Sequence, residues 1–140
     1  MIKYLADTHI LLWAMESDLN QSKLPEKAKS ILLDTNAEIW YSFVNVWEVA
    51  LKRVRYPELM PYTAQQFEQL CRASGFLPLR TEFKHAITME TLTFDREAAP
   101  QDHKDPFDRL LLAQAKSENM FFMTHDHLMP FYHENCIVMV

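Results

Sequence analysis

Short apolar segments alternate along the chain with longer segments in which apolar residues recur every three to four positions. The short segments are expected to form strands, because each is a brief apolar run bounded by polar or turn-forming residues. They lie at 2–6, 38–42, 76–79, 120–124 and 136–140, the third being weakened by Pro78. Strands that are apolar on both faces are typical of a parallel sheet covered by helices on both sides.

The longer segments carry signals for helix ends. Pro25 stands near the start of one segment and Gly75 follows the end of another, which are the preferred places of these residues. Ser42 or Asn45 can cap the helix that follows the second strand. The expected helices lie at 9–15, 26–34, 46–54, 63–74, 81–92 and 107–119, and the polar stretch 94–104 is expected to be a loop.

This alternation predicts an α/β fold with three layers and a mainly parallel central sheet. The 140 residues suit one domain, residues 1–140, and a single glycine disfavours glycine-rich phosphate loops and hairpin-dense β folds. Two cysteines give no disulfide framework, and the chain shows neither an export signal nor a membrane-spanning run. We therefore expect a soluble cytoplasmic protein.

Acidic residues fall at places that a sheet can bring together. Asp7 directly follows the first strand, Asp126 lies two residues beyond the fourth, and Glu48 and Asp108 lie near helix starts. In open α/β sheets a ligand site forms beyond the carboxyl ends of the strands. The sequence thus predicts convergence of these carboxylates, with Asp105 beside them.

Most of these acids also have a purely structural explanation. Asp7 and Asp126 could cap helices or stabilise turns, and Asp105 before Pro106 is a strong helix start. Asn45 and Glu48, three residues apart, resemble a capping box. Asp108 is harder to explain in this way, because it begins the apolar stripe of its own helix, where an unpaired charge is costly to bury.

Converging carboxylates suit Mg²⁺ or Mn²⁺ better than zinc. The six histidines show no zinc-binding spacing, and we expect them to be surface or hydrogen-bonding residues. The net charge of −5 disfavours a nucleic-acid ligand at first sight, but the five acids alone supply −5 and two divalent ions would return +4. Phosphates could be met by the basic residues Lys52, Arg53, Arg55, Lys104 and Arg109.

Four segments in this order resemble the PIN-domain family, and most closely its VapC-type toxins. They are LADTHILLWA (5–14), VWEVALK (46–52), HKDPFDRLLLAQA (103–115) and MTHDHL (123–128). The resemblance covers essentially the whole chain. It implies a three-layer α/β/α domain, Mg²⁺- or Mn²⁺-dependent endoribonuclease activity on RNA, a cognate antitoxin and a homodimer.

The resemblance also implies roles for individual residues. Its acidic set matches Asp7, Glu48, Asp108 and Asp126, and Asp105 matches an acid common in the subgroup with the DPFDR motif. The small polar residues that support the acidic set in this family match Thr8, Ser42 and Thr124. Asp7 and Asp108 would hold the principal ion, with Glu48 and Asp126 completing or orienting its shell. An antitoxin would insert an amphipathic segment into an apolar groove lined by Trp13, Trp47 and nearby helices, with an arginine reaching the acids.

Two other functions fit parts of the pattern. A non-catalytic PIN-like module could keep the acids and bind an antitoxin-like peptide or RNA. A phosphohydrolase built around Asp7 would need a second aspartate two residues later, where His9 stands.

Overall fold

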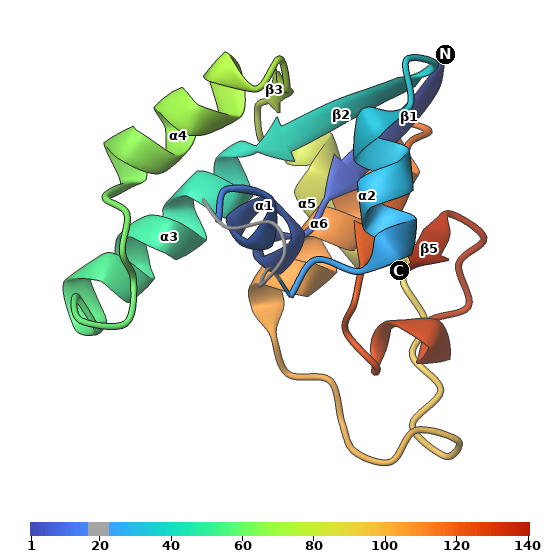
Figure 1. The fold of residues 1–140 in the computed structure, drawn as a ribbon. Coiled ribbons are helices and arrows are strands. Elements are labelled where there is room, and N and C mark those ends of the chain that lie inside the picture. The colour runs from blue at the N-terminus through green and yellow to red at the C-terminus, as the bar shows by residue number, and fades with distance from the viewer. Residues whose placement is uncertain (17–22) are drawn as a thin grey trace.

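A computed structural model describes residues 1–16 and 23–140 (Figure 1). The strands are β1 (Ile2–Ala6), β2 (Ala37–Ser42), β3 (Leu77–Leu79), β4 (Phe121–Thr124) and β5 (Ile137–Met139). The helices are α1 (Thr8–Ala14), α2 (Glu26–Leu33), α3 (Phe43–Arg55), α4 (Ala64–Ala73), α5 (Phe83–Met89) and α6 (Pro106–Ser117), with a 3₁₀ turn η1 (Met129–Phe131). Within the described ranges, none of the helices has the length and apolar character needed to cross a membrane.

All five strands are parallel to their neighbours, in the order β3-β2-β1-β4-β5. The chain proceeds from β1 outward to β2 and β3, and then returns to the other side of β1 for β4 and β5. The carboxyl ends of β1 and β4 therefore border the point where the strand order reverses, the usual place of a ligand site in such sheets. Ala6 is paired with Met123, so Asp7 and Thr124 follow side by side at this edge.

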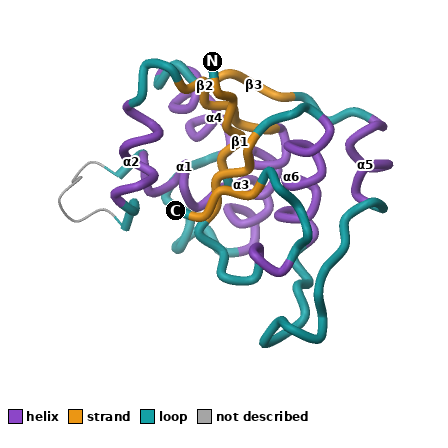
Figure 2. Tube along the Cα trace, turned by 90° about the vertical axis from the view of Figure 1, so that its right-hand side faces the viewer, coloured by secondary structure: helices purple, strands orange, loops and turns teal. Residues whose placement is uncertain are grey.

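Helices cover both faces of the sheet, which confirms the predicted three layers. Successive strand residues point to opposite faces, so Leu5 belongs to one buried cluster and Ala6 to the other. The cluster around Ala6 includes residues of α1, α2 and α4, whereas the cluster around Leu5 includes residues of α6. Figure 2 shows α1 and α2 on one side of the strands and α5 and α6 on the other.

The predicted elements are present, with different ends. Helix α3 begins at Phe43, which confirms Ser42 as its cap among the two predicted residues, and Asn45 closes the capping box with it. This pairing contradicts the alternative in which Glu48 closes the box with Asn45. Helix α5 is shorter than the expected 81–92, and η1 was not predicted, since a single 3₁₀ turn is too short to show a periodic pattern.

Candidate metal centre

Asp7 joins the end of β1 to the start of α1. It caps α1, with its Oδ1 accepting the His9 N–H at 2.7 Å, and its Oδ2 accepts the Thr124 hydroxyl at 2.7 Å. The residue is only 3% exposed. Asp7 is therefore both the cap of α1 and one of the converging carboxylates. The cap fixes its position, and the parallel pairing of β1 and β4 brings Thr124 to its second oxygen.

Asp126 is held by the turn after β4. Its backbone N–H donates to the Thr124 Oγ1 at 3.1 Å, and its Oδ1 accepts the Leu128 N–H at 2.9 Å. The Thr124 hydroxyl thus contacts both acids that follow the central strands.

Helix α6 brings two further acids to the same place. Asp105 is its N-cap, accepting the N–H groups of Phe107 at 2.9 Å and Asp108 at 3.3 Å, and Pro106 occupies the first turn. Asp108 has a side chain only 14% exposed, in line with its position at the start of the buried stripe. The cap expected for Asp105 is confirmed.

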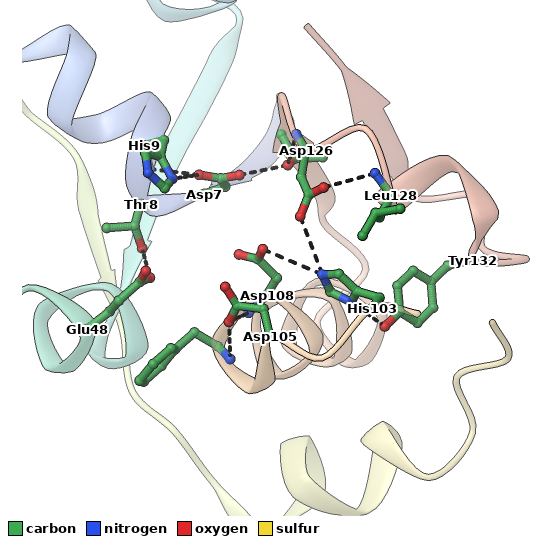
Figure 3. A network of polar contacts seen from close by, with 12 residues as sticks. Asp7, Thr8, His9, Glu48, His103, Asp105, Asp108, Asp126, Leu128 and Tyr132 are labelled. Atoms are coloured by element: carbon green, nitrogen blue, oxygen red, sulfur yellow. Dashed lines mark hydrogen bonds and ion pairs between the residues drawn. The ribbon is translucent and has the colours of Figure 1, made fainter. Parts of the chain in front are cut away.

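The four aspartates line one cavity of about 310 Å³ (Figure 3). Its lining consists of Asp7, His9, Trp13, Asp105, Asp108, His125 and Asp126. None of these lining residues, all within the described part of the chain, is a lysine or an arginine. The cavity therefore has a strongly negative wall with aromatic rings beside it.

The electrostatics of the aspartates differ. Burial raises the pKa of Asp7, which the bonds from Thr124 and His9 oppose, and burial raises the pKa of Asp108 to about 7. The negative charges of Asp7 and Asp105 add to the shift at Asp108. The pKa of Asp126 is lowered, chiefly by His103. Crowded carboxylates with raised pKa values are what a cation would stabilise, so the residues present fit a divalent ion.

His103 is a site residue that the sequence did not reveal. It is 4% exposed, with its Nδ1 2.6 Å from the Tyr132 hydroxyl and its Nε2 3.3 Å from Asp126 Oδ2 and 3.7 Å from Asp108 Oδ2. Burial alone would lower its pKa, but the two carboxylates and Tyr132 outweigh burial and raise the pKa to about 10. Because His103 lies in the loop 94–104, no periodic pattern marks it as buried.

Glu48 does not line the cavity but contacts Thr8, the neighbour of Asp7 in sequence. Its Oε1 accepts the Thr8 hydroxyl at 2.6 Å, its Oε2 lies 2.9 Å from Lys52 Nζ, and its side chain is 4% exposed. The Asn45 side chain in turn donates to the Thr8 Oγ1 at 3.0 Å. Lys52, which the sequence offered as a phosphate ligand, is therefore engaged with Glu48.

Ser42 supports the helices next to the site. Its hydroxyl donates to Gln114 Oε1 at 2.6 Å and accepts the Val44 N–H at 2.9 Å. This residue joins the start of α3 to the middle of α6. Among the hydrogen bonds of the described residues, none joins Ser42 to a candidate carboxylate.

Comparisons with known proteins give a family and a fold. The sequence matches the family described as PIN domain over residues 4–131. A comparison with curated proteins gives no significant match.

Three solved structures share the fold, and the second of them is described as a toxin–antitoxin complex. VapBC2 from Rickettsia felis, bound to a DNA fragment from its promoter, has 17% identity and a TM-score of 0.60, covering 89% of this chain and 88% of that chain. A complex from Klebsiella pneumoniae has 20% identity and a TM-score of 0.56, covering 96% and 95%. VapBC-1 from nontypeable Haemophilus influenzae has 19% identity and a TM-score of 0.55, covering 89% and 87%.

Proposed function

Because the chain belongs to the PIN domain family, we propose that it is a metal-dependent endoribonuclease that hydrolyses RNA phosphodiesters as the toxin of a type II toxin–antitoxin pair. One observation carries the proposal. Four aspartates, from the end of β1, the start of α6 and the turn after β4, line a single cavity where the strand order of the sheet reverses. Such a cavity can hold divalent cations beside a phosphodiester.

Asp7 and Asp108 would hold the principal ion, Mg²⁺ or Mn²⁺, with Asp126 and Asp105 around it. A divalent ion at such a site supplies a water of lowered pKa for in-line attack and stabilises the leaving oxygen. The fit rests on two buried aspartates whose pKa values are raised chiefly by burial. The charge of Glu48 adds to the shift at Asp7, and the charges of Asp7 and Asp105 add to the shift at Asp108. Of the two candidate ions, Mn²⁺ is the more useful probe because it is visible by paramagnetic resonance.

The chain's own residues orient these ligands. Thr124 and the His9 N–H fix both oxygens of Asp7, so this carboxylate cannot rotate freely. Glu48 would act through the Thr8 hydroxyl, which it accepts at 2.6 Å, as an outer member of the site. Asp105 has one oxygen committed to the cap of α6, which gives it a peripheral place among the ligands.

The lining of the cavity supports the proposed metal dependence. A phosphodiester approaching Asp7, Asp105, Asp108 and Asp126 meets repulsion, and no lysine or arginine belongs to the described lining. Bound cations would have to neutralise this wall before an RNA backbone could enter. Cleavage is therefore expected to be absent in a chelator and restored by Mn²⁺ or Mg²⁺.

The antitoxin partner is supported by an exposed apolar stripe on α3. It consists of Phe43, Trp47, Leu51 and Val54, which are 58%, 45%, 46% and 84% exposed. The spacing of these residues places them along one side of the helix. Trp47 packs edge-on against Phe107, next to Asp108 in sequence, with ring centroids 5.1 Å apart. An apolar antitoxin segment on this stripe could extend an arginine toward the carboxylates.

The test of the nuclease proposal replaces one carboxylate at a time. Asp7→Asn and Asp108→Asn should abolish Mn²⁺-dependent cleavage of a single-stranded RNA while leaving the circular dichroism spectrum unchanged. Asp34→Asn is the matched control, because it removes the same charge from an exposed residue before β2. Undiminished cleavage by both site variants would overturn the proposal. Tight binding of an antitoxin-like peptide by a wild-type protein without any nuclease activity would instead favour the non-catalytic module.

A further inference from the structure

His103 carries a buried nitrogen that forms ion pairs with two carboxylates but no hydrogen bond to either. Its Nε2 lies 3.3 Å from Asp126 Oδ2 and 3.7 Å from Asp108 Oδ2 (Figure 3). Both distances exceed the usual 2.7–3.2 Å of an N–H···O bond. Among the described residues, this buried atom has no hydrogen-bond partner. Buried polar atoms are nearly always satisfied, so this exception calls for a ligand.

The other ring nitrogen is held in the way that metal-binding histidines are held. Nδ1 lies 2.6 Å from the hydroxyl of Tyr132, a residue only 3% exposed, and the two rings meet edge-on. A histidine that binds a metal through one nitrogen usually donates its other N–H to an oxygen, which fixes the ring. Tyr132 thereby directs Nε2 toward Asp108 and Asp126.

The spacing of the three donor atoms suits a shared cation. Bonds of about 2.0–2.2 Å to nitrogen and oxygen place neighbouring ligands of one ion roughly 3–3.5 Å apart. One ligand atom each from His103, Asp108 and Asp126 lies within 4.8 Å of the other two. The two His103 distances are thus close to ligand spacing and longer than direct hydrogen bonds.

A second cavity lies beside His103. It measures about 600 Å³ and is lined by Gln101, Asp102, His103, Lys104, Asp105, Asp126 and Leu128. Asp105 and Asp126 also line the first cavity, so these two residues lie between the two hollows. Asp7 lines only the first cavity and His103 only the second.

We propose that His103, Asp108 and Asp126 form a second cation site with a nitrogen ligand, adjoining the all-oxygen site around Asp7. The proposal deepens, and rests on, the metal dependence proposed above. A cation bound here takes the place of the Nε2 proton between His103 and the two carboxylates, and that proton is released to solvent. Because imidazole suits transition metals better than Mg²⁺, this site selects Mn²⁺ over Mg²⁺.

A similar cluster elsewhere in the chain contains a histidine whose two ring nitrogens both have hydrogen-bond partners. His85 lies with Glu82 and Glu118 at comparable spacing. Its Nδ1 accepts the Glu82 N–H at 3.0 Å, and its Nε2 lies 2.9 Å from Glu118 Oε1, where Lys84 already supplies a cation at 2.9 Å. Both nitrogens of His85 are used, so that cluster has no place for an ion.

The test detects nitrogen bound to Mn²⁺ by pulsed electron paramagnetic resonance of the full-length protein. Wild-type protein with Mn²⁺ should show coupling to a directly bound ¹⁴N, and ¹⁵N-histidine labelling should change that coupling. His103→Gln should abolish it and should lower the preference for Mn²⁺ over Mg²⁺ by at least tenfold in calorimetric titration. His9→Gln and His125→Gln are the matched controls, because these histidines line only the first cavity.

Each possible result supports or contradicts the proposed His103 cation site. Bound Mn²⁺ without nitrogen coupling in the wild type would overturn the His103 site while leaving the proposed nuclease intact. Coupling lost in either control would also overturn it. If His103→Gln fails to fold, the His9→Gln/His125→Gln double variant must retain the coupling, and its loss there refutes the site. Absence of any Mn²⁺ binding would refute both this site and the proposed function.

Discussion

The Thr124 hydroxyl holds together the two acids that follow the central strands. It donates to Asp7 Oδ2 at 2.7 Å and accepts the Asp126 N–H at 3.1 Å. Because Asp7 is buried and its pKa is raised by desolvation, this bond opposes the cost of its charge. Thr124 therefore supports the charged form of Asp7, the form that binds a cation.

At the residue scale, Thr124→Val is expected to weaken Mn²⁺ binding by about 10–100-fold, the usual cost of losing a group that orients a ligand. Thr124→Ser keeps the hydroxyl and should bind within a few-fold of the wild type. Calorimetric titration measures both. Equal affinities of the valine variant and the wild type would contradict a supporting role for this residue.

The capping role of Asp105 and the effect of its charge can be tested separately by substitution. Asparagine caps a helix as well as aspartate, so Asp105→Asn should leave the free energy of unfolding nearly unchanged. Asp105→Ala removes the bonds to Phe107 and Asp108 and should cost about 1 kcal/mol. Urea denaturation of the two variants tests this, and equal stability of Asp105→Ala and the wild type would refute the cap. Any loss of Mn²⁺ affinity in Asp105→Asn then reports on the charge alone.

At the scale of elements, the pairing of α5 with α6 depends on a polar contact. His85 on α5 is fully buried and lies 2.9 Å from Glu118, the last residue capping α6, and Lys84 contacts the same carboxylate at 2.9 Å. The bonds from Lys84 and His85 lower the pKa of Glu118 below its ordinary value of 4.5. Glu118 therefore stabilises the fold when it is charged.

The pH dependence of this contribution has a definite sign. A carboxyl with a lowered pKa in the folded state stabilises fully above its ordinary pKa, and this stabilisation is lost as the pH falls through the lowered value. The wild type should thus exceed Glu118→Gln in stability by no more than about 1 kcal/mol at pH 7, because the contact is partly exposed. Denaturation curves between pH 7 and pH 3 should show the difference shrinking below pH 4.5. A difference independent of pH would exclude this role.

Helix ends show how far local sequence defines an element. Gly75 ends α4 with a φ of +81°, a conformation that glycine adopts without strain, and it was predicted. Asn119 ends α6 with a φ of +56°, and there the chain turns so that the Met120 N–H bonds to the Ala115 carbonyl at 2.9 Å. The prediction extended α6 to residue 119, because asparagine is a weaker stop signal than glycine.

At the scale of the whole molecule, a cation bound only by the folded state should stabilise it. Mn²⁺ at a hundred times its dissociation constant adds about 2.7 kcal/mol, which corresponds to a rise in Tm of roughly 5–10 °C for a domain of this size. Asp108→Asn should lose most of this rise, while Asp34→Asn should keep it. Scanning calorimetry with and without EDTA measures the effect, and an equal rise in both variants would show that Mn²⁺ binds elsewhere.

The sequence determined the layers of this protein, because apolar periodicity and end signals act locally along the chain. It also placed Asp7, Asp108 and Asp126 after strands or at a helix start, from which the parallel sheet brings them to one edge. It also predicted Glu48 among the converging carboxylates, whereas the structure bonds Glu48 to the Thr8 hydroxyl and leaves it out of the cavity lining.

Only the tertiary structure decided the position of His103. Its loop has no repeating pattern, and it becomes buried because Phe94 forms a bridge with Tyr132 and the ring then packs against both. Contacts between segments far apart in the chain leave no mark on the spacing of residues. The strands and most of the acids are therefore defined by the sequence, whereas the nitrogen beside those acids is defined by the fold.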